Sequence, residues 1–251
     1  MTYRQTVLVT GGSGKLGRGI VGALLTDGAR VIVPTRSIDS AGSLRQGTSD
    51  QDLFLFETDL AQENGLLRLL DWMRRNSIEI SHVVHSARSL HSLTVEPDGV
   101  TAPEMFKAEL DLQVVLPYRL TMALALSVEH ALESVVFLGS QYGLVAPNPA
   151  LYQGRLDSSP IQYGVAKGAL HHLTRELAVR LAPRVRVNAV AFGGFEGRTD
   201  EGFRLRYAAL SPNGRMLRDE EAVGPVLFLL GEGSSSITGH VLVADGGWSI
   251  W

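Results

Sequence analysis

A glycine-rich turn between an apolar run and a helical segment constrains this chain most. Residues Val7–Thr10 are typical of a short buried strand, and a helical pattern runs from Arg18 to Asp27. The turn between them reads Gly11-Gly-Ser13-Gly14-Lys15-Leu16-Gly17. Glycines let a backbone approach a pyrophosphate, and the N-terminus of the next helix offers free amides. The sequence therefore predicts a dinucleotide-binding unit, with a purely structural turn as the alternative.

The rest of the chain repeats the alternation of strand and helix. Further strands are predicted at Ala29–Pro34, Leu53–Phe56, Ile80–His85, Ser134–Gly139, Arg184–Val190 and Val241–Ala244. Helices are predicted at Ala61–Arg75, Pro103–Ser127, Tyr163–Leu181 and Glu220–Leu230. This order indicates a doubly wound α/β domain with a mainly parallel sheet of about seven strands and helices on both faces. With 251 residues, 45% of them hydrophobic, the chain suffices for one domain over residues 1–251.

Composition excludes several classes of function. There is no cysteine, which excludes disulfides and thiolate metal sites, and the paired histidines His82/His85 and His171/His172 lack the spacing of a metal motif. The net charge is −3, without a concentrated basic patch for nucleic acid or membrane. We expect no signal peptide, because the apolar run within Met1–Thr10 is too short, and no stretch approaches the roughly 20 apolar residues that cross a bilayer. We expect a cytoplasmic protein that acts on a small molecule and holds no metal.

Tyr163 and Lys167 are the first candidates for chemistry. Positions four apart on a helix share a face, so the phenol and the ammonium are expected to stand together. A neighbouring ammonium favours the phenolate and lowers its pKa from about 10. Such a tyrosine could exchange a proton with a reacting oxygen near neutral pH. An ordinary surface pair on an amphipathic helix is the alternative.

Arg36 bears on the choice of cofactor. It follows the second predicted strand, where a carboxylate would bind the ribose 2′-hydroxyl of NAD and an arginine suits the 2′-phosphate of NADP. No acid occurs until Asp39, and Lys15 is expected to add a second positive charge nearby. The sequence favours NADP(H) over NAD, unless both cations are only solvated surface charges.

Together these features resemble the short-chain dehydrogenase/reductase family. The matching marks run through nearly the whole chain in the family's order: Thr10-Gly11, Gly14, Gly17, Asp59-Leu60, Ser86-Ala87, Ser140, Tyr163, Lys167, Val187-Asn188, Ile237-Thr-Gly and Asp245-Gly-Gly247.

The resemblance implies a role for each matching position. Tyr163 would be the general acid or base, Lys167 would lower its pKa and hold the nicotinamide ribose, and Ser140 would hydrogen-bond the substrate oxygen. The other implied cofactor contacts are Asp59 and Leu60 at the adenine, Ser86 and Ala87 along the cofactor, and Gly193 to Phe195 beside the nicotinamide.

Several positions depart from the family pattern. The usual Asn-Asn-Ala-Gly reads His85-Ser86-Ala87-Arg88, and the usual Pro-Gly after the sixth strand reads Phe192-Gly193. The glycine spacing is closer to the extended and atypical branches. The asparagine that many members use to hold a relay water aligns with Gln113, whose extra methylene changes the geometry. We still expect activity, and the alternative is a non-catalytic dinucleotide-binding regulator.

A long segment between Ser140 and Tyr163 bears on the substrate. Residues 142–154 must leave and return at the active-site edge, where loops tend to carry specificity. This segment and the ending Trp248-Ser-Ile-Trp251 resemble the branch of bacterial surface-sugar biosynthesis, such as nonulosonic-acid pathways, which implies a sugar or sugar-nucleotide carbonyl. The segment could instead only support a neighbouring subunit.

A mobile flap over the substrate is predicted at Phe195–Leu217, because this stretch is rich in glycine and arginine and only weakly helical. Three of its arginines, Arg198, Arg204 and Arg206, could meet an anionic group, although solvation is their more ordinary role. The family resemblance also implies a homotetramer or dimer.

Overall fold

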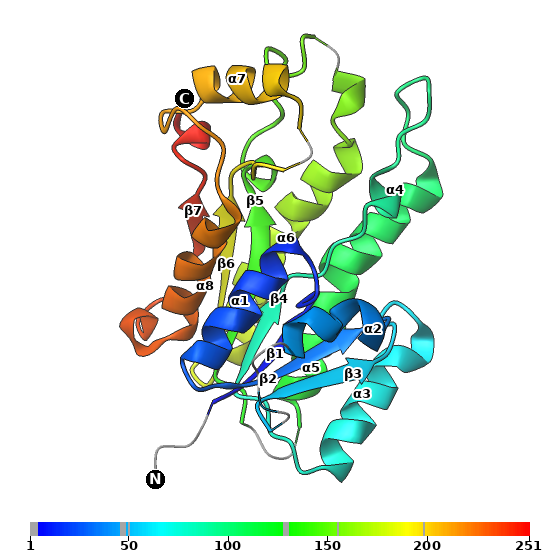
Figure 1. The fold of residues 1–251 in the computed structure, drawn as a ribbon, viewed down its shortest axis with the longest axis vertical. Coiled ribbons are helices and arrows are strands. Elements are labelled where there is room, and N and C mark those ends of the chain that lie inside the picture. The colour runs from blue at the N-terminus through cyan, green and yellow to red at the C-terminus, as the bar shows by residue number, and fades with distance from the viewer. Residues whose placement is uncertain (1–4, 46–48, 50, 128–130, 155, 198) are drawn as a thin grey trace.

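The computed structural model describes residues 5–45, 49, 51–127, 131–154, 156–197 and 199–251. Its centre is a seven-stranded sheet in the order β3-β2-β1-β4-β5-β6-β7, with every neighbouring pair parallel (Figure 1). The predicted doubly wound α/β architecture is thereby confirmed. The strands are β1 (Thr6–Thr10), β2 (Arg30–Thr35), β3 (Leu53–Glu57), β4 (His82–His85), β5 (Ser134–Ser140), β6 (Arg186–Phe192) and β7 (Val241–Ala244).

Helices connect the strands and cover both faces of the sheet. They are α1 (Lys15–Thr26), α2 (Ile38–Ala41), α3 (Glu63–Arg75), α4 (Pro103–Leu110), α5 (Leu116–Ala125), α6 (Ile161–Leu181), α7 (Glu201–Leu210) and α8 (Val223–Leu230). One core joins the sheet to α3, α5 and α6, and a second joins the other face to α1 and α8. Because both faces are covered, β1 and β5 are buried along their whole length, as their continuous apolar runs predict.

Two predicted elements differ from the structure. The helical region expected at Pro103–Ser127 is interrupted by a π-helical segment, Asp111–Val115, between α4 and α5. The stretch expected as a weakly structured flap contains α7, whose Tyr207 is only 1% exposed. Periodicity alone could not show either feature, because a π turn shifts the register by a single residue and α7 is held by distant partners.

A third, smaller core lies beyond the C-terminal ends of the strands. Leu151, Tyr207, Met216 and Trp248 form it, so it joins the long segment after β5, the flap and the C-terminus. Figure 1 shows α7 and the C-terminus together at this end of the molecule. This end of the sheet is therefore capped by a packed unit, called the cap below.

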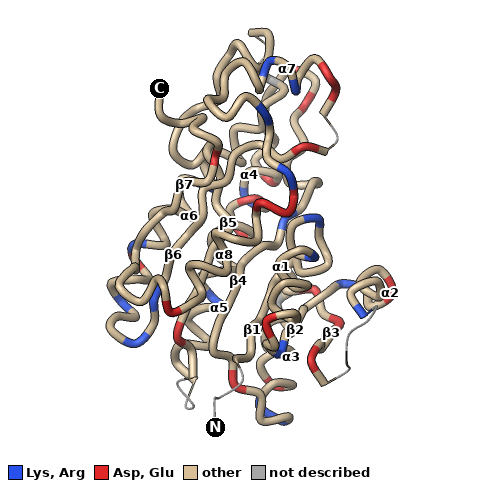
Figure 2. Tube along the Cα trace, turned by 60° about the vertical axis from the view of Figure 1, so that its left-hand side comes forward, with Lys and Arg blue, Asp and Glu red and all other residues tan. Residues whose placement is uncertain are grey.

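Charges of both signs are interspersed over the trace in Figure 2. Among the residues that the structure describes, no helix has both the length and the apolar character needed to cross a membrane.

Candidate active site

The glycine turn after β1 forms a tight backbone cradle in which side chains would not fit. Gly11 has φ +66°, and a Cβ there would lie 2.6 Å from the Cα of Ala87. A Cβ on Gly17 would lie 2.2 Å from the Gly11 carbonyl oxygen. The N-cap of α1 is Gly14, and it has no side-chain cap, so no side chain competes for the amides of the first turn. This cradle fits the pyrophosphate of a dinucleotide.

The edge expected to meet the adenosine ribose carries an exposed arginine. Arg36 follows β2 and is exposed, as a contact to a 2′-phosphate requires. In this structure the Lys15 ammonium pairs with Asp219 at 2.9 Å and donates to the carbonyl of Glu196. The role of Lys15 as a cofactor contact stays a prediction.

The other predicted cofactor contacts lie at the C-terminal ends of β3 and β4. Asp59 and Leu60 are half-buried after β3, and the Asp59 carboxylate accepts a hydrogen bond from the amide of Ala61. Ser86 and Ala87 follow β4, and the Ser86 amide donates to Thr10 of β1. All four residues therefore border the same edge of the sheet as the glycine turn.

The predicted trio Ser140, Tyr163 and Lys167 comes together at the next strand. Ser140 ends β5, and Tyr163 and Lys167 lie in the first two turns of α6. The Ser140 side chain lies close enough to the Tyr163 phenol to lower its pKa. The Lys167 ammonium lies 5.7 Å from the centroid of the Tyr163 ring, and α6 packs against β5 and β6. A serine hydroxyl, a phenol and an ammonium therefore share one point at the sheet edge.

The protonation of Tyr163 differs from the prediction. Burial raises the pKa of the phenol, whereas the Ser140 hydrogen bond and the nearby Arg88 guanidinium oppose that rise. The predicted net lowering by Lys167 is therefore wrong for this structure. The reason is geometric, since the ammonium donates to the Leu138 carbonyl at 2.6 Å and to Gln113 rather than to the phenol.

Lys167 is itself perturbed by its surroundings. It is 6% exposed, and burial lowers its pKa to about 8, with Glu109 acting in the opposite direction. Half of the Lys167 side chains therefore lose their proton only about one pH unit above neutrality.

Gln113 contacts Lys167 directly. The Gln113 Oε1 accepts from the Lys167 Nζ at 2.7 Å, and its Nε2 donates to the Ala87 carbonyl at 3.4 Å. Gln113 is 3% exposed and lies in the π-helical segment 111–115. Its side chain thus links the lysine to the backbone beside the glycine turn, an arrangement that the position in sequence alone did not predict.

Glu109, one helical turn before Gln113, is a buried acid that the sequence analysis missed. It is 0% exposed, and one carboxylate oxygen accepts from the Ser92 hydroxyl at 2.5 Å. Burial raises the pKa of Glu109, and the hydrogen bond from Ser92 and the charge of Lys167 oppose that rise. No catalytic spacing in the sequence marks this residue, since an acid at that position reads as an ordinary helix surface.

The predicted nicotinamide side, Gly193 to Phe195, is held by side chains from the cap. The Tyr207 hydroxyl accepts from the Gly194 amide at 2.8 Å and donates to the buried Gln141 at 3.0 Å. The Tyr207 ring stacks on Trp248 at 4.4 Å between centroids. Phe195 forms a bridge with Leu217. This backbone is therefore tied to β5 and to the C-terminus.

The segment after β5 begins beside the first turn of α6, since a Cβ on Gly164 would lie 3.3 Å from the Tyr142 carbonyl oxygen. Leu151 is fully buried, and the hydroxyls of Tyr142 and Tyr152 lie 2.8 Å apart. Of the three flap arginines, Arg206 donates to the Leu151 carbonyl at 2.8 Å and Arg204 is exposed. Arg198 lies outside the described residues. A backbone carbonyl thus uses the Nε of Arg206, and binding of an anion by Arg204 or Arg206 stays a prediction.

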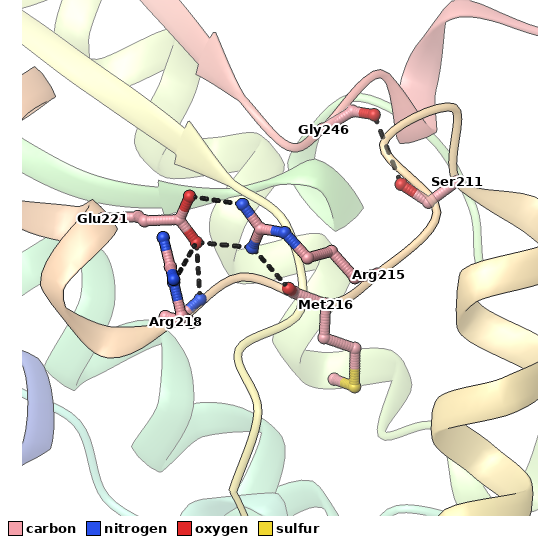
Figure 3. Close-up of polar contacts among 6 residues, drawn as sticks. All are labelled: Ser211, Arg215, Met216, Arg218, Glu221 and Gly246. Carbon is pink, nitrogen blue, oxygen red and sulfur yellow. Dashed lines mark hydrogen bonds and ion pairs between the residues drawn. The ribbon is translucent and has the colours of Figure 1, made fainter.

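The end of the flap is fastened to the body of the domain (Figure 3). Arg215 donates to both oxygens of Glu221 at 2.7 Å, and the Arg218 amide donates to the same carboxylate at 2.7 Å. Ser211 donates to the Gly246 carbonyl at 3.2 Å. Both ends of the region after α7 are thus connected to neighbouring elements.

The chain is similar to known proteins over nearly its whole length. A family model described as "Enoyl-(Acyl carrier protein) reductase" matches residues 13–249. The chain is 30% identical to the uncharacterized oxidoreductase YmfI of Bacillus subtilis over 97% of this chain and 98% of that protein. It is 28% identical to the rhamnolipids biosynthesis 3-oxoacyl-[acyl-carrier-protein] reductase of Pseudomonas aeruginosa, over 98% and 96%. It superposes on the RhlG/NADP active-site complex of Pseudomonas aeruginosa with a TM-score of 0.84 at 26% identity, covering 98% and 96% of the two chains.

Proposed function

The chain belongs to the short-chain dehydrogenase/reductase family and is an NAD(P)-dependent oxidoreductase, and we propose that it reduces a carbonyl group with NADPH or oxidises the alcohol in reverse. The observation that carries this proposal is the meeting of Ser140, Tyr163 and Lys167 beside the glycine cradle. The nicotinamide would supply or accept the hydride.

The protein's own side chains divide the remaining work. Tyr163 donates its phenolic proton to the substrate oxygen during reduction and takes it back during oxidation. Ser140, which lies beside the phenol, donates a hydrogen bond to the same oxygen as negative charge develops there. Lys167 places a positive charge beneath the phenol, and Gln113 and the Leu138 carbonyl hold that charge in position. Gln113 is thus a positioning residue for the lysine.

Preference for NADPH rests on Arg36. Its exposed guanidinium suits a 2′-phosphate because it forms two parallel hydrogen bonds. Reversing the charge by Arg36→Asp is expected to weaken NADPH binding relative to NADH, measured by fluorescence titration of each cofactor. An unchanged ratio of the two dissociation constants would show that the ribose lies elsewhere.

For the substrate we propose a sugar or sugar-nucleotide carbonyl, of the kind used in bacterial surface-sugar synthesis. The paired hydroxyls of Tyr142 and Tyr152, in the segment after β5, support a polar substrate. The name of the Pseudomonas relative instead suggests a 3-oxoacyl thioester as the second candidate. A panel containing oxo-sugars, sugar nucleotides and 3-oxoacyl thioesters separates the two classes.

Turnover itself is tested with the same panel. Loss of the reduced nicotinamide's absorbance with any member supports the proposal, and Ser140→Ala is expected to slow that reaction about 10²-fold or more. Cofactor binding with no turnover of any carbonyl would favour the alternative of a non-catalytic regulator. The family relationship and the preserved trio do not favour that alternative.

We propose that the protein works as a homo-oligomer in the cytoplasm, as the family resemblance implies. Apolar side chains exposed on α5 and α6 support an interface: Tyr118 is 45% exposed, Val165 46% and Val179 78%. Light scattering coupled to size-exclusion chromatography gives the mass directly, and a monomer would contradict this part of the proposal.

A further inference from the structure

Arg88 places a second cation beside Tyr163. It follows Ser86-Ala87 at the end of β4, at the position where the family pattern has glycine. Its guanidinium carbon lies 5.6 Å from the centroid of the Tyr163 ring, within the range of a cation–π contact. The side chain therefore reaches from the cofactor edge of the sheet to the residue proposed to protonate the substrate.

The guanidinium has no counter-ion in the part of the chain that the structure describes. Arg88 is exposed there and forms no ion pair or side-chain hydrogen bond with another described residue. The Glu109 carboxylate interacts electrostatically with Arg88, but it is fully buried and accepts a hydrogen bond from the Ser92 hydroxyl. A guanidinium has five N–H donors in a planar fork, and here they are left for solvent or a ligand.

Lys167, the other cation beside Tyr163, is not available to a ligand from outside the protein. Lys167 is buried and donates to Gln113 and to the Leu138 carbonyl. Arg88 is thus the charged group beside the phenol that remains accessible from outside the protein. An exposed guanidinium is hydrated, so its charge costs little folding free energy. It can also form an ion pair that stabilises a bound anion.

We propose that Arg88 binds an anionic oxygen group of the substrate, so that the enzyme selects carbonyl compounds carrying a carboxylate or a phosphate within a few bonds of the reacting carbon. The inference rests on the proposed function, because it takes the substrate oxygen to lie at Tyr163 and Ser140. It adds to that function by specifying that the substrate carries an anionic group. A sugar nucleotide and an oxo acid both satisfy it, and they differ in which anion they present.

The experiment measures binding without turnover. An alcohol cannot react with the reduced cofactor, so the NADPH complex is titrated by calorimetry with alcohols in matched pairs. The carboxylate pair is 3-hydroxybutyrate and 3-hydroxybutyramide, and the phosphate pair is glycerol 3-phosphate and glycerol. The proteins are the unmodified chain, Arg88→Gln and Arg88→Lys. A charge-matched control is Arg180→Gln, on the exposed end of α6 and about 25 Å along the helix from Tyr163.

We expect the charged member of at least one pair to bind about 10- to 100-fold more tightly than its neutral partner. The preference should vanish in Arg88→Gln, persist in part in Arg88→Lys and be unchanged in Arg180→Gln. The pair that shows it identifies the anion as carboxylate or phosphate.

Three results would overturn the inference: no preference in either pair, a preference that survives Arg88→Gln, or weaker NADPH binding in Arg88→Gln, which would assign the guanidinium to the cofactor. Failure of the proposed function looks different. In that case the anion preference depends on Arg88, but no carbonyl in the turnover panel is reduced.

Discussion

Replacing Gln113 by leucine should destabilise the protein in a pH-dependent way. The substitution keeps the size of the side chain but removes the oxygen that accepts from the buried Lys167 ammonium at 2.7 Å. A hydrogen bond to a charged group contributes about 1.5–3 kcal/mol. One pKa unit corresponds to about 1.4 kcal/mol, so the pKa of Lys167 should fall from about 8 by roughly one to two units.

The sign follows from linkage between protonation and folding. The pKa of Lys167 in the folded protein lies below its value in the unfolded chain, so the charged lysine costs stability at low pH. The variant deepens that cost only where the folded lysine is charged. Its loss of unfolding free energy should therefore be about 2 kcal/mol at about pH 6 and below, should shrink as the pH rises toward about 8, and should be nearly absent above that value.

The assay is urea unfolding of the unmodified protein and of Gln113→Leu at several pH values between about 6 and 9. Gln162→Leu is a matched control, because Gln162 is also a buried glutamine but donates to neutral backbone carbonyls of Ser92 and Thr94. Its loss of stability should not depend on pH. A Gln113→Leu penalty that is equally independent of pH would refute the idea that Gln113 stabilises the charge of Lys167.

Two further predictions concern the cradle and the cap. Gly17→Ala should lower the free energy of unfolding by about 1–3 kcal/mol and weaken NADPH binding, because its Cβ would lie 2.2 Å from the Gly11 carbonyl oxygen. Gly22→Ala on the same helix is the control: its Cβ would meet open space, so the variant should be neutral or stabilised by up to about 1 kcal/mol. Equal cofactor affinities in these two variants, by fluorescence titration, would count against the cradle. Leu151→Ala should lower the unfolding free energy by about 2–5 kcal/mol in thermal or urea denaturation, since Leu151 is fully buried in the third core; a loss under about 1 kcal/mol would mean that the cap is loosely packed.

Much of the fold could be predicted because its signals are local. The strands β1 and β5 are buried on both faces, so their sequences are continuous apolar runs, and the glycines near Gly11 mark the first turn. The strand at Val241–Ala244 agrees residue for residue with its prediction. Local pattern was sufficient wherever burial alone decided the structure.

The electrostatics of the site could not be predicted in this way. A spacing of four residues placed Tyr163 and Lys167 on one face of α6, but it did not show that the ammonium donates to Gln113 and Leu138 instead of approaching the phenol. Those partners come from the π-helical segment and from β5, which lie 54 and 29 residues away in the chain.

Long-range contacts also explain the other surprises. Lys15 pairs with Asp219 because the segment just after the flap lies beside the glycine turn, and Tyr207 is buried because Trp248 at the far end of the chain stacks on it. Neither residue carries a sequence signal for its partner. Their roles depend on tertiary packing, which a reading of adjacent residues does not contain.

The most direct test of the account is Tyr163→Phe, assayed for both turnover and cofactor binding. Removing the hydroxyl leaves the ring, the glycine cradle and Lys167 in place, so the NADPH dissociation constant should be unchanged. Carbonyl reduction by the variant should fall by about 10²- to 10⁴-fold, the usual contribution of a general acid. Reduction at the rate of the unmodified protein would show that another group protonates the substrate and would contradict the proposed mechanism.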